Sequence, residues 1–452
     1  MSKPGYFVAI IGSGVAGSEA AFQLSKRGIN IALFEQHKLP YGKIEEGLPK
    51  WHVKLRNQEE QKIDDKIQNP HIHYIPNVRL GRNFTISQLL EWKFSAVLIA
   101  FGAWRDRPLS IEGIDNYIGR GLYYQNSFVS WFNHKHELDY SGPDIQVEDN
   151  SIVIGGGLAS LDVVKIVMLE TVCDALAKRN YPIDILTLEK DGIYETLKKL
   201  KLKLSDLQLK GCTLYYRRKI IDMPLAPMPP NIAPDRKEKV YQVRERILKN
   251  YQQKYLFKVQ ECRQPVDKIV KEDRLYGLVF EKTDDVSGKI SGTKGEQFRV
   301  ESPLVISSIG SIPEKIPGLP YSHELLAIDN PTTGQIKGFN HVFAIGNAVT
   351  GRGNIRESQL HGRDMSLQLI NNYLGLGDEE LKKMVAQNEH DTAEQTRKIT
   401  REVKKNDPLP FFQLTSILGK IREMQAKSGF KDDYKKWIKQ NRPVRLEEML
   451  EK

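Results

Sequence analysis

The feature that most constrains this chain is a glycine-rich turn between a buried strand pattern and a helix pattern. Residues 6–11 are a continuous apolar run, typical of a central parallel strand covered on both faces. Residues 12–17 read Gly-Ser-Gly-Val-Ala-Gly, and residues 18–26 then show helical periodicity. A second apolar strand pattern, residues 31–34, ends at Glu35, 18 positions after the last glycine of the turn. This order predicts a βαβ unit that binds a dinucleotide.

Each glycine of this turn has a physical reason. Gly12 makes the tight turn, Gly14 lets the backbone approach a pyrophosphate, and Gly17 allows the helix to pack closely on the strand. The pyrophosphate would lie on the free N–H groups at the start of the helix. Glu35 would accept hydrogen bonds from the adenosine ribose.

A second glycine-rich turn follows about 140 residues later. Residues 151–154 form an apolar strand pattern, and residues 155–160 read Gly-Gly-Gly-Leu-Ala-Ser before another helix pattern. Serine is small enough to stand at the third position. We expect the next strand over residues 183–188, ending at Glu189, 32 positions after Gly157. This spacing is longer than the usual value of about 20, so the second match is weaker.

Two nucleotide-binding units in one chain indicate two nucleotides. The simplest chemical reason is a bound flavin that takes a hydride from a nicotinamide and then passes electrons on singly. No catalytic acid or base is required, because the hydride passes directly from nicotinamide to flavin.

Two further segments fit a flavin domain. Residues 94–103 form an apolar strand pattern that ends in Phe-Gly-Ala, and residues 342–348 form a strand pattern that enters a second glycine-rich stretch. A helix is predicted from near Ile355 to Ile370. Its positive end would face negative charge that develops on a reduced flavin.

In this order the motifs resemble those of adrenodoxin reductase and its bacterial ferredoxin–NADP reductase relatives. The small subunit of glutamate synthase and the glutathione-reductase-like proteins with two dinucleotide-binding domains are more distantly similar. The resemblance runs from about residue 6 to residue 370 and rests on both glycine turns, Glu35, Pro40-Tyr41-Gly42, Phe101-Gly102-Ala103, Phe128-Val129-x-Trp131, Asp162, Ser307-Ser308-Ile309-Gly310, Gly346 and residues 351–355.

The resemblance implies an α/β fold with two Rossmann-like domains, one inserted in the other. The FAD domain would comprise residues 1–115 and 330–452, and the NAD(P)H domain residues 116–329. For FAD, we expect contacts from Gly12, Gly14, Ala16, Gly17, Glu35, Gln36, Gly42, Gly102, Ala103, Gly346, Asn347, Asn354 and Ile355. Of these, Gln36 follows Glu35, Gly102 and Ala103 belong to the Phe-Gly-Ala motif, and the resemblance implies the others. For the nicotinamide cofactor, it implies contacts from Gly155, Gly157, Leu158 and Ala159.

The choice between NADH and NADPH rests on the residues after the second strand of the nicotinamide domain. NADP-dependent members of the family carry two arginines there, whereas residues 187–192 of this chain read Thr-Leu-Glu-Lys-Asp-Gly. Glu189 would repel a 2′-phosphate and accept from ribose hydroxyls, while Lys190 offers one cation. The sequence therefore favours NADH slightly. A further departure is Asn347, where adrenodoxin reductase has tryptophan.

Cysteine and metal-ligand spacing exclude several redox centres. The three cysteines, Cys173, Cys212 and Cys262, include no close pair, so neither a disulfide framework, nor a dithiol site, nor a four-cysteine iron–sulfur cluster is expected. No cluster of His, Cys and Asp has metal-ligand spacing, and no metal is predicted. The flavin would be the chain's own redox centre.

Charge suggests what accepts the electrons. The chain carries 67 Lys and Arg against 57 Asp and Glu, a net charge of +10, and residues 397–452 hold 15 basic against 8 acidic residues. A basic surface would steer an acidic ferredoxin or flavodoxin, although solvated helix faces explain most such runs. A reductase of small molecules or quinones, and an electron-input subunit of a larger complex, fit the same motifs.

We expect a cytoplasmic protein without a membrane span or nucleic acid partner. We interpret the proline-rich residues 224–234 as a stiff loop.

Overall fold

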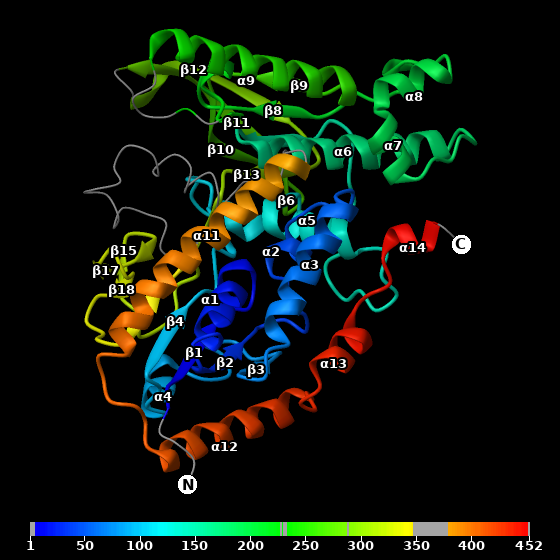
Figure 1. The fold of residues 1–452 in the computed structure, drawn as a ribbon. Helices are drawn as coiled ribbons and strands as arrows, with labels where there is room; N and C mark the ends of the chain where they lie inside the picture. Colours follow the sequence, from blue (N-terminus) through cyan, green and yellow to red (C-terminus); the bar gives the residue numbers. More distant parts are fainter. Residues whose placement is uncertain (1–4, 227, 229–232, 287–288, 347–377, 451–452) are drawn as a thin grey trace.

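A computed structural model describes residues 5–226, 228, 233–286, 289–346 and 378–450 (Figure 1). Within them the chain forms two large sheets, built mainly of parallel strands, with helices packed against them. None of the helices in these ranges combines the length and apolar character that crossing a bilayer requires.

The first sheet has seven strands that come from both ends of the chain. Its order is β17-β18-β19-β4-β1-β2-β3, and pairing is parallel from β19 to β3. The strands β17 and β18 extend it by antiparallel pairing. The bounds are β1 Phe7–Ile11, β2 Asn30–Phe34, β3 Ile72–Ile75, β4 Ala96–Ile99, β17 Ile328–Asn330, β18 Gln335–Ile336 and β19 Val342–Ala344.

Both faces of this sheet are covered, as the apolar run of β1 predicts. Phe7, Ala9 and Ile11 pack in one cluster with residues of α12 (Phe411–Ser428). Val8 and Ile10 point to the opposite face and pack in a cluster with residues of α1 (Val15–Ser25), α3 (Val53–Ile67) and α11 (Asp378–Val403). Alternate side chains of one strand thus feed two separate cores.

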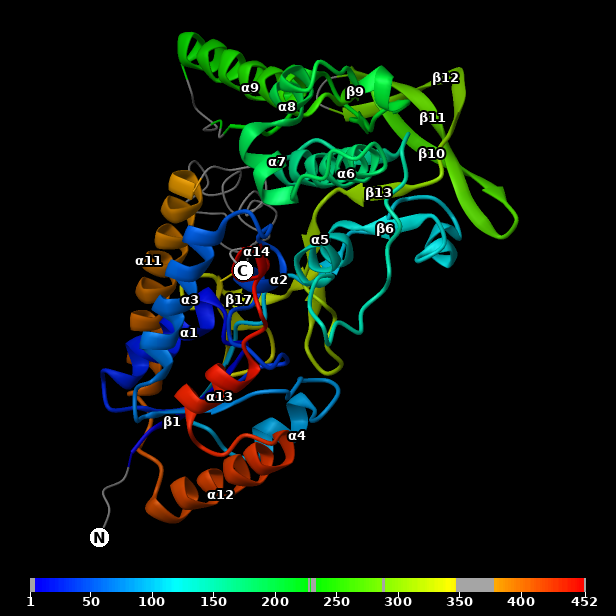
Figure 2. The ribbon, with the colours of Figure 1, turned by 90° about the vertical axis from the view of Figure 1, so that its right-hand side faces the viewer.

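The second sheet has five parallel strands in the order β6-β13-β7-β8-β9. Helices α5 (Gln125–His134), α6 (Leu158–Ala177) and α9 (Pro234–Tyr255) share a core with one face. A three-stranded antiparallel sheet covers the other face (Figure 2). The bounds are β6 Leu122–Tyr124, β7 Ile152–Gly155, β8 Thr213–Tyr215, β9 Lys258–Gln260 and β13 Val305–Ser308, then β10 Arg263–Lys271, β11 Arg274–Val286 and β12 Lys289–Glu301 for the antiparallel sheet.

Two connections between the sheets run side by side. The strand β5 (Arg105–Asp106) leaves the first sheet after β4, and β14 (Ser311–Ile312) leaves the second after β13. They pair antiparallel, Ser311 with Asp106 and Ile312 with Arg105. Shorter elements complete the described fold: α2 Lys43–Glu46, α4 Ile86–Glu91, α8 Ile193–Lys199, α13 Tyr434–Asn441, α14 Leu446–Leu450, η1 Ile114–Tyr117, η2 Leu204–Leu207, η3 Ile220–Asp222, β15 Tyr321–Ser322 and β16 Leu325–Leu326.

The strand predicted over residues 183–188 is wrong, because this segment leads into a helix, α7 (Ile185–Asp191). The side chain of Asp184 caps the helix by accepting a hydrogen bond from the backbone N–H of Thr187 at 2.9 Å. The next strand along the chain, which pairs with β7, is instead β8. A short apolar run does not distinguish strand from buried helix, and here the helix-capping aspartate decides it.

Candidate functional site

The first glycine turn is held by contacts that only glycine permits. Gly12 has a φ of +101°, and a Cβ there would lie 2.7 Å from the carbonyl oxygen of Ala100. A Cβ on Gly17 would lie 1.8 Å from the carbonyl oxygen of Gly12. Gly14 precedes α1, and no side chain caps the start of that helix. The N–H groups at the start of this helix are therefore not satisfied by a capping side chain, as the binding of an anionic group would require.

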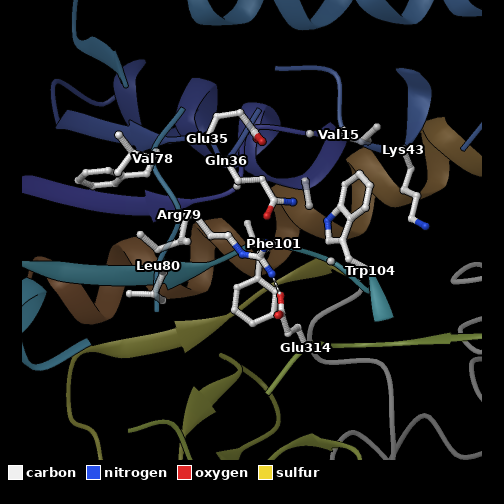
Figure 3. A pocket seen from close by; sticks show the side chains of 18 of the residues that line it. Val15, Glu35, Gln36, Lys43, Val78, Arg79, Leu80, Phe101, Trp104 and Glu314 are labelled. Atoms are coloured by element: carbon white, nitrogen blue, oxygen red, sulfur yellow. Dashed lines mark hydrogen bonds and ion pairs between the residues drawn. The ribbon is translucent and has the colours of Figure 1, made fainter. Parts of the chain in front are cut away.

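A cavity opens at this turn (Figure 3). It encloses about 930 Å³ of empty space, part of it open to solvent. The predicted site residues that line it are Gly12, Gly14, Ala16, Glu35, Gln36, Gly42 and Gly102. The remaining lining residues come mainly from residues 78–80, residues 100–104 and the segment that includes Lys43.

Three predicted residues on this side of the molecule do not line the cavity but lie close to it. Gly17 serves packing, and Ala103 is buried. Gly346 has a φ of +59°, and a Cβ there would come within 2.6 Å of the Cβ of Ala16, so the end of β19 abuts the turn. Asn347, Asn354 and Ile355, with the helix predicted to Ile370, lie outside the described residues.

Glu35 is held rigidly at the end of β2. One carboxylate oxygen accepts from the backbone N–H and the hydroxyl of Ser13, at 3.0 and 2.7 Å, and the other accepts from the backbone N–H of His37 at 2.9 Å. The residue is buried and lines the cavity. These bonds tie the glycine turn to the neighbouring strand and fix the position of the carboxylate.

The two ends of the cavity differ in chemistry. Val78 and Leu80 lie at one end, and Lys43 and Trp104 lie at the other (Figure 3). Arg79 forms an ion pair with Glu314, and both side chains line the cavity. These residues are not among those predicted from the sequence. Val78 and Leu80 could have been found by predicting β3 and following it past its carboxyl end, but no motif indicates Lys43 or Glu314.

The second glycine turn is packed in a similar manner. A Cβ on Gly155 would lie 2.5 Å from the carbonyl oxygen of Ser308. The hydroxyl of Ser160 donates to this carbonyl at 3.0 Å, which explains serine at the third position. Gly157 precedes α6, and no protein atom of the described residues lies within 4 Å of a Cβ built there. Leu158 and Ala159, in the first turn of α6, are buried.

The predicted placement of Glu189 and Lys190 after the strand beside β7 is wrong, because both residues belong to α7. Glu189 forms an ion pair with Lys165 of α6 at 2.5 Å and lies 3.3 Å from the hydroxyl of Tyr255 in α9. The Lys165 ammonium also stands over the Trp51 ring, 3.9 Å from its centroid. Glu189 therefore links helices and is not at the end of a sheet strand.

Aromatic and basic residues follow β8, the strand that comes after β7 in the chain and pairs with it. Tyr216, Arg217 and Arg218 follow β8 directly. A Cβ on Gly156 would lie 2.1 Å from the Tyr216 ring, so this segment lies against the second glycine turn. The backbone carbonyls of Arg217 and Arg218 accept from the Thr283 hydroxyl at 2.8 Å and from the N–H of Cys262 at 3.0 Å. The backbone of both arginines is thus anchored beside the turn.

One hydrogen-bonded cluster connects the first cavity to the second sheet. The ammonium group of Lys43 donates to the side-chain oxygen of Asn126, which lies in the first turn of α5. The side-chain NH₂ of Asn126 donates to the Trp104 carbonyl at 3.1 Å and to the Ser311 hydroxyl at 3.0 Å. Its backbone N–H lies 3.2 Å from both carboxylate oxygens of Asp106. Burial raises the pKa of Asp106 to about 6, against the opposing charge of Lys43.

A buried ionic network lies behind the cavity. Arg445, near the carboxyl end, donates to both oxygens of Glu45 at 2.6 and 2.7 Å and to Glu60 at 2.8 Å. His134 lies 2.6 Å from a Glu137 oxygen and 3.4 Å from a Glu46 oxygen. Glu45, His134 and Glu137 lie close enough together to hold a metal ion. Because Arg445 already neutralises Glu45, we interpret the group as an ion-pair network.

Comparison with known proteins finds similarity over the first part of the chain. Residues 6–169 match the model of the pyridine nucleotide-disulphide oxidoreductase family. The chain is 28% identical over 166 residues to the mitochondrial NADPH:adrenodoxin oxidoreductase of Arabidopsis thaliana, which covers 36% of this chain and 33% of that protein. It is 31% identical over 180 residues to the glutamate synthase [NADPH] small chain of Bacillus subtilis, covering 36% of this chain and 32% of that protein. The resemblance to the adrenodoxin reductase type is confirmed.

The solved structure of FprA from Mycobacterium tuberculosis in complex with NADPH is similar over almost the whole chain. The TM-score is 0.65 at 19% identity, and the match covers 94% of this chain and 91% of that one. The predicted α/β fold with two dinucleotide-binding domains is confirmed. The chain spans about a third of the length of the curated relatives it matches. All three of its cysteines are free thiols.

Proposed function

We propose that this protein is an FAD-dependent oxidoreductase that takes electrons from NADPH and passes them to a small acidic electron carrier of the ferredoxin or flavodoxin type. The observation that carries the proposal is the pairing of two glycine turns, each at the carboxyl end of a parallel strand, with a cavity at the first turn whose lining residue Lys43 bonds to Asn126 of α5, beside the second sheet. Two nucleotide sites connected in this way suit electron transfer between two bound cofactors.

The residues of the cavity fit FAD. The uncapped start of α1 beside Gly14 would hold the pyrophosphate, and Glu35 would receive the ribose. The apolar end formed by Val78 and Leu80 suits adenine, which leaves the end with Lys43 and Trp104 for the flavin ring. FAD would supply the hydride acceptor, and these residues would bind and orient it.

The arginines after β8 favour NADPH over NADH. Arg217 is exposed and Arg218 half-buried, and both follow the strand that pairs with β7, where a 2′-phosphate would be bound. This reverses the preference for NADH drawn from Glu189, which the structure places on a helix. The nicotinamide cofactor would rest on the start of α6, with the open face of Gly157 toward it.

An acidic protein is the acceptor best supported by the charge of the chain. The net charge of +10 attracts an acidic carrier, and the chain's three cysteines cannot ligate a four-cysteine iron–sulfur cluster that would carry electrons further. Two similar proteins are named for adrenodoxin. Others are named as a small chain or a subunit, so electron input into a larger complex is the second candidate.

A visible absorption spectrum and an anaerobic titration test the proposal. We expect the purified protein to show bound flavin that NADPH bleaches with a higher kcat/KM than NADH. Reduction of a ferredoxin should slow as the salt concentration rises, because charge steering is screened. Absence of flavin would overturn the whole proposal. A rate independent of salt, or rapid reduction of quinones alone, would overturn the choice of acceptor.

A further inference from the structure

We propose that Lys43 is an electrostatic residue at the flavin ring, where its positive charge favours the reduced, anionic form of the cofactor. This inference rests on the proposed function and names a residue that none of the family motifs contains. It follows from where the ammonium group lies, what surrounds it and what charge the reaction creates.

The position of Lys43 is the first step. It follows Gly42, and a Cβ on Gly42 would lie 3.4 Å from the Cα of Gly14 in the pyrophosphate turn. The side chain leads away from that turn, since its ammonium group bonds to Asn126 of α5 and stands 4.8 Å from the centre of the Trp104 ring. Trp104 follows β4 of the first sheet, whereas Asn126 follows β6 of the second. The charge therefore lies where the two sheets meet and the two cofactor rings must approach each other.

The surroundings of the ammonium group are the second step. Within the part of the chain that the structure describes, no carboxylate lies within the 4.0 Å ion-pair distance of Lys43. The nearby acids are Asp106, which Asn126 holds by its backbone N–H, and Glu46 on the same helix. Burial lowers the pKa of Lys43 to about 8, against the attraction of Asp106 and Glu46. A partly desolvated cation that is bonded to a neutral amide gains more electrostatic stabilisation from an anionic ligand than a cation already paired with a carboxylate does.

The charge created in the reaction is the third step. In NADPH + FAD → NADP⁺ + FADH⁻ the C4–H bond of the nicotinamide breaks and a bond from that hydrogen to flavin N5 forms. The hydride brings two electrons and one proton, so the flavin gains a net negative charge. A fixed cation at the ring stabilises the product more than the neutral reactant. Lys43 would thus raise the reduction potential of the bound flavin.

The test compares charge-removing and charge-keeping variants. Lys43→Met and Lys43→Gln remove the charge, and the glutamine can still donate to Asn126, which guards against loss of folding in the methionine variant. Lys43→Arg keeps the charge. Lys427→Met removes a positive charge from the surface of α12, where the Lys427 side chain is 73% exposed, and is the matched control. The reduction potential of the bound flavin is measured by equilibrium titration with a redox dye.

We expect the neutral variants to retain flavin. Their affinity for reduced flavin, relative to oxidised flavin, should be at least tenfold lower than in the parent. For a two-electron couple this lowers the potential by about 30 mV or more. Lys43→Arg and Lys427→Met should stay near the parent value. An unchanged potential in both neutral variants would overturn the inference alone. Equal weakening of oxidised FAD, reduced FAD and ADP would show that Lys43 binds the pyrophosphate, which also overturns it. A parent protein without flavin would overturn the proposed function as well.

Discussion

At the two glycine turns, some glycines are required for folding and others for the proposed binding of a ligand. Gly12 and Gly17 are required by the protein itself, since a Cβ at either position would meet backbone atoms closer than 3.0 Å. Gly14 and Gly157 are different. The nearest atom to a Cβ on Gly14 is 3.9 Å away, and for Gly157 none of the described atoms lies within 4 Å. The space beside these two glycines is open, as the proposed binding of a ligand requires.

Alanine at Gly14 or Gly157 should therefore impair binding without unfolding the chain. We expect Gly14→Ala to change the free energy of unfolding by less than about 1 kcal/mol and to weaken FAD binding by about tenfold or more, because the methyl group meets the pyrophosphate. Gly157→Ala should keep its flavin and raise KM for NADPH. Flavin content after gel filtration and steady-state kinetics check the pair. Loss of flavin in both variants, or in neither, would contradict the assignment of the turns.

At the scale of elements, the first βαβ unit was predictable and the second only in part. The apolar run of β1 and the glycines after it leave one arrangement, so β1, α1, β2 and the position of Glu35 follow from the sequence. Residues 183–188 do not specify their structure, because six residues with an apolar majority suit a strand or a helix. The long segment between α6 and β8 hid the true partner strand and its two arginines. Lys43, Val78 and Glu314 reach the cavity only through tertiary contacts, which no local pattern records.

The corrected order of elements predicts which side chains select the cofactor. Arg217→Ala and Arg218→Ala should each raise KM for NADPH by about 10-fold or more, since each loses a charged contact worth about 1.5–3 kcal/mol, with little change for NADH. Glu189→Gln is the matched control, because its carboxylate pairs with Lys165 inside the helical layer. It should leave the ratio of kcat/KM for the two cofactors unchanged. A shift of this ratio in Glu189→Gln alone would restore the original interpretation.

At the scale of the whole molecule, the carboxyl-terminal helices tie the two ends of the chain together. The helices α12 and α13 run along the first sheet, and α14 returns to α2 (Figures 1 and 2). Arg445 there binds Glu45 of α2 and Glu60 of α3. The next residue of α2, Glu46, pairs with His134 at the end of α5. Part of the basic carboxyl-terminal segment is thus structural, and its net charge overstates what is available for docking.

The ion pair between Glu46 of α2 and His134 of α5 predicts that the stability of the fold depends on pH. Burial alone would lower the pKa of His134, but the bonds to Glu137 and Glu46 raise this pKa to about 10. In the unfolded chain the pKa is about 6.5. A raised folded-state pKa gives stability that is complete below pH 6.5 and is lost as the pH rises toward 10. His134→Gln should therefore cost about 2–4 kcal/mol at pH 6, and the difference from the parent should shrink by pH 10. Urea unfolding at pH 6, 8 and 10 checks this, and Glu137→Gln should show the same trend. Parallel profiles for parent and variant would mean that the histidine is neutral in the folded protein.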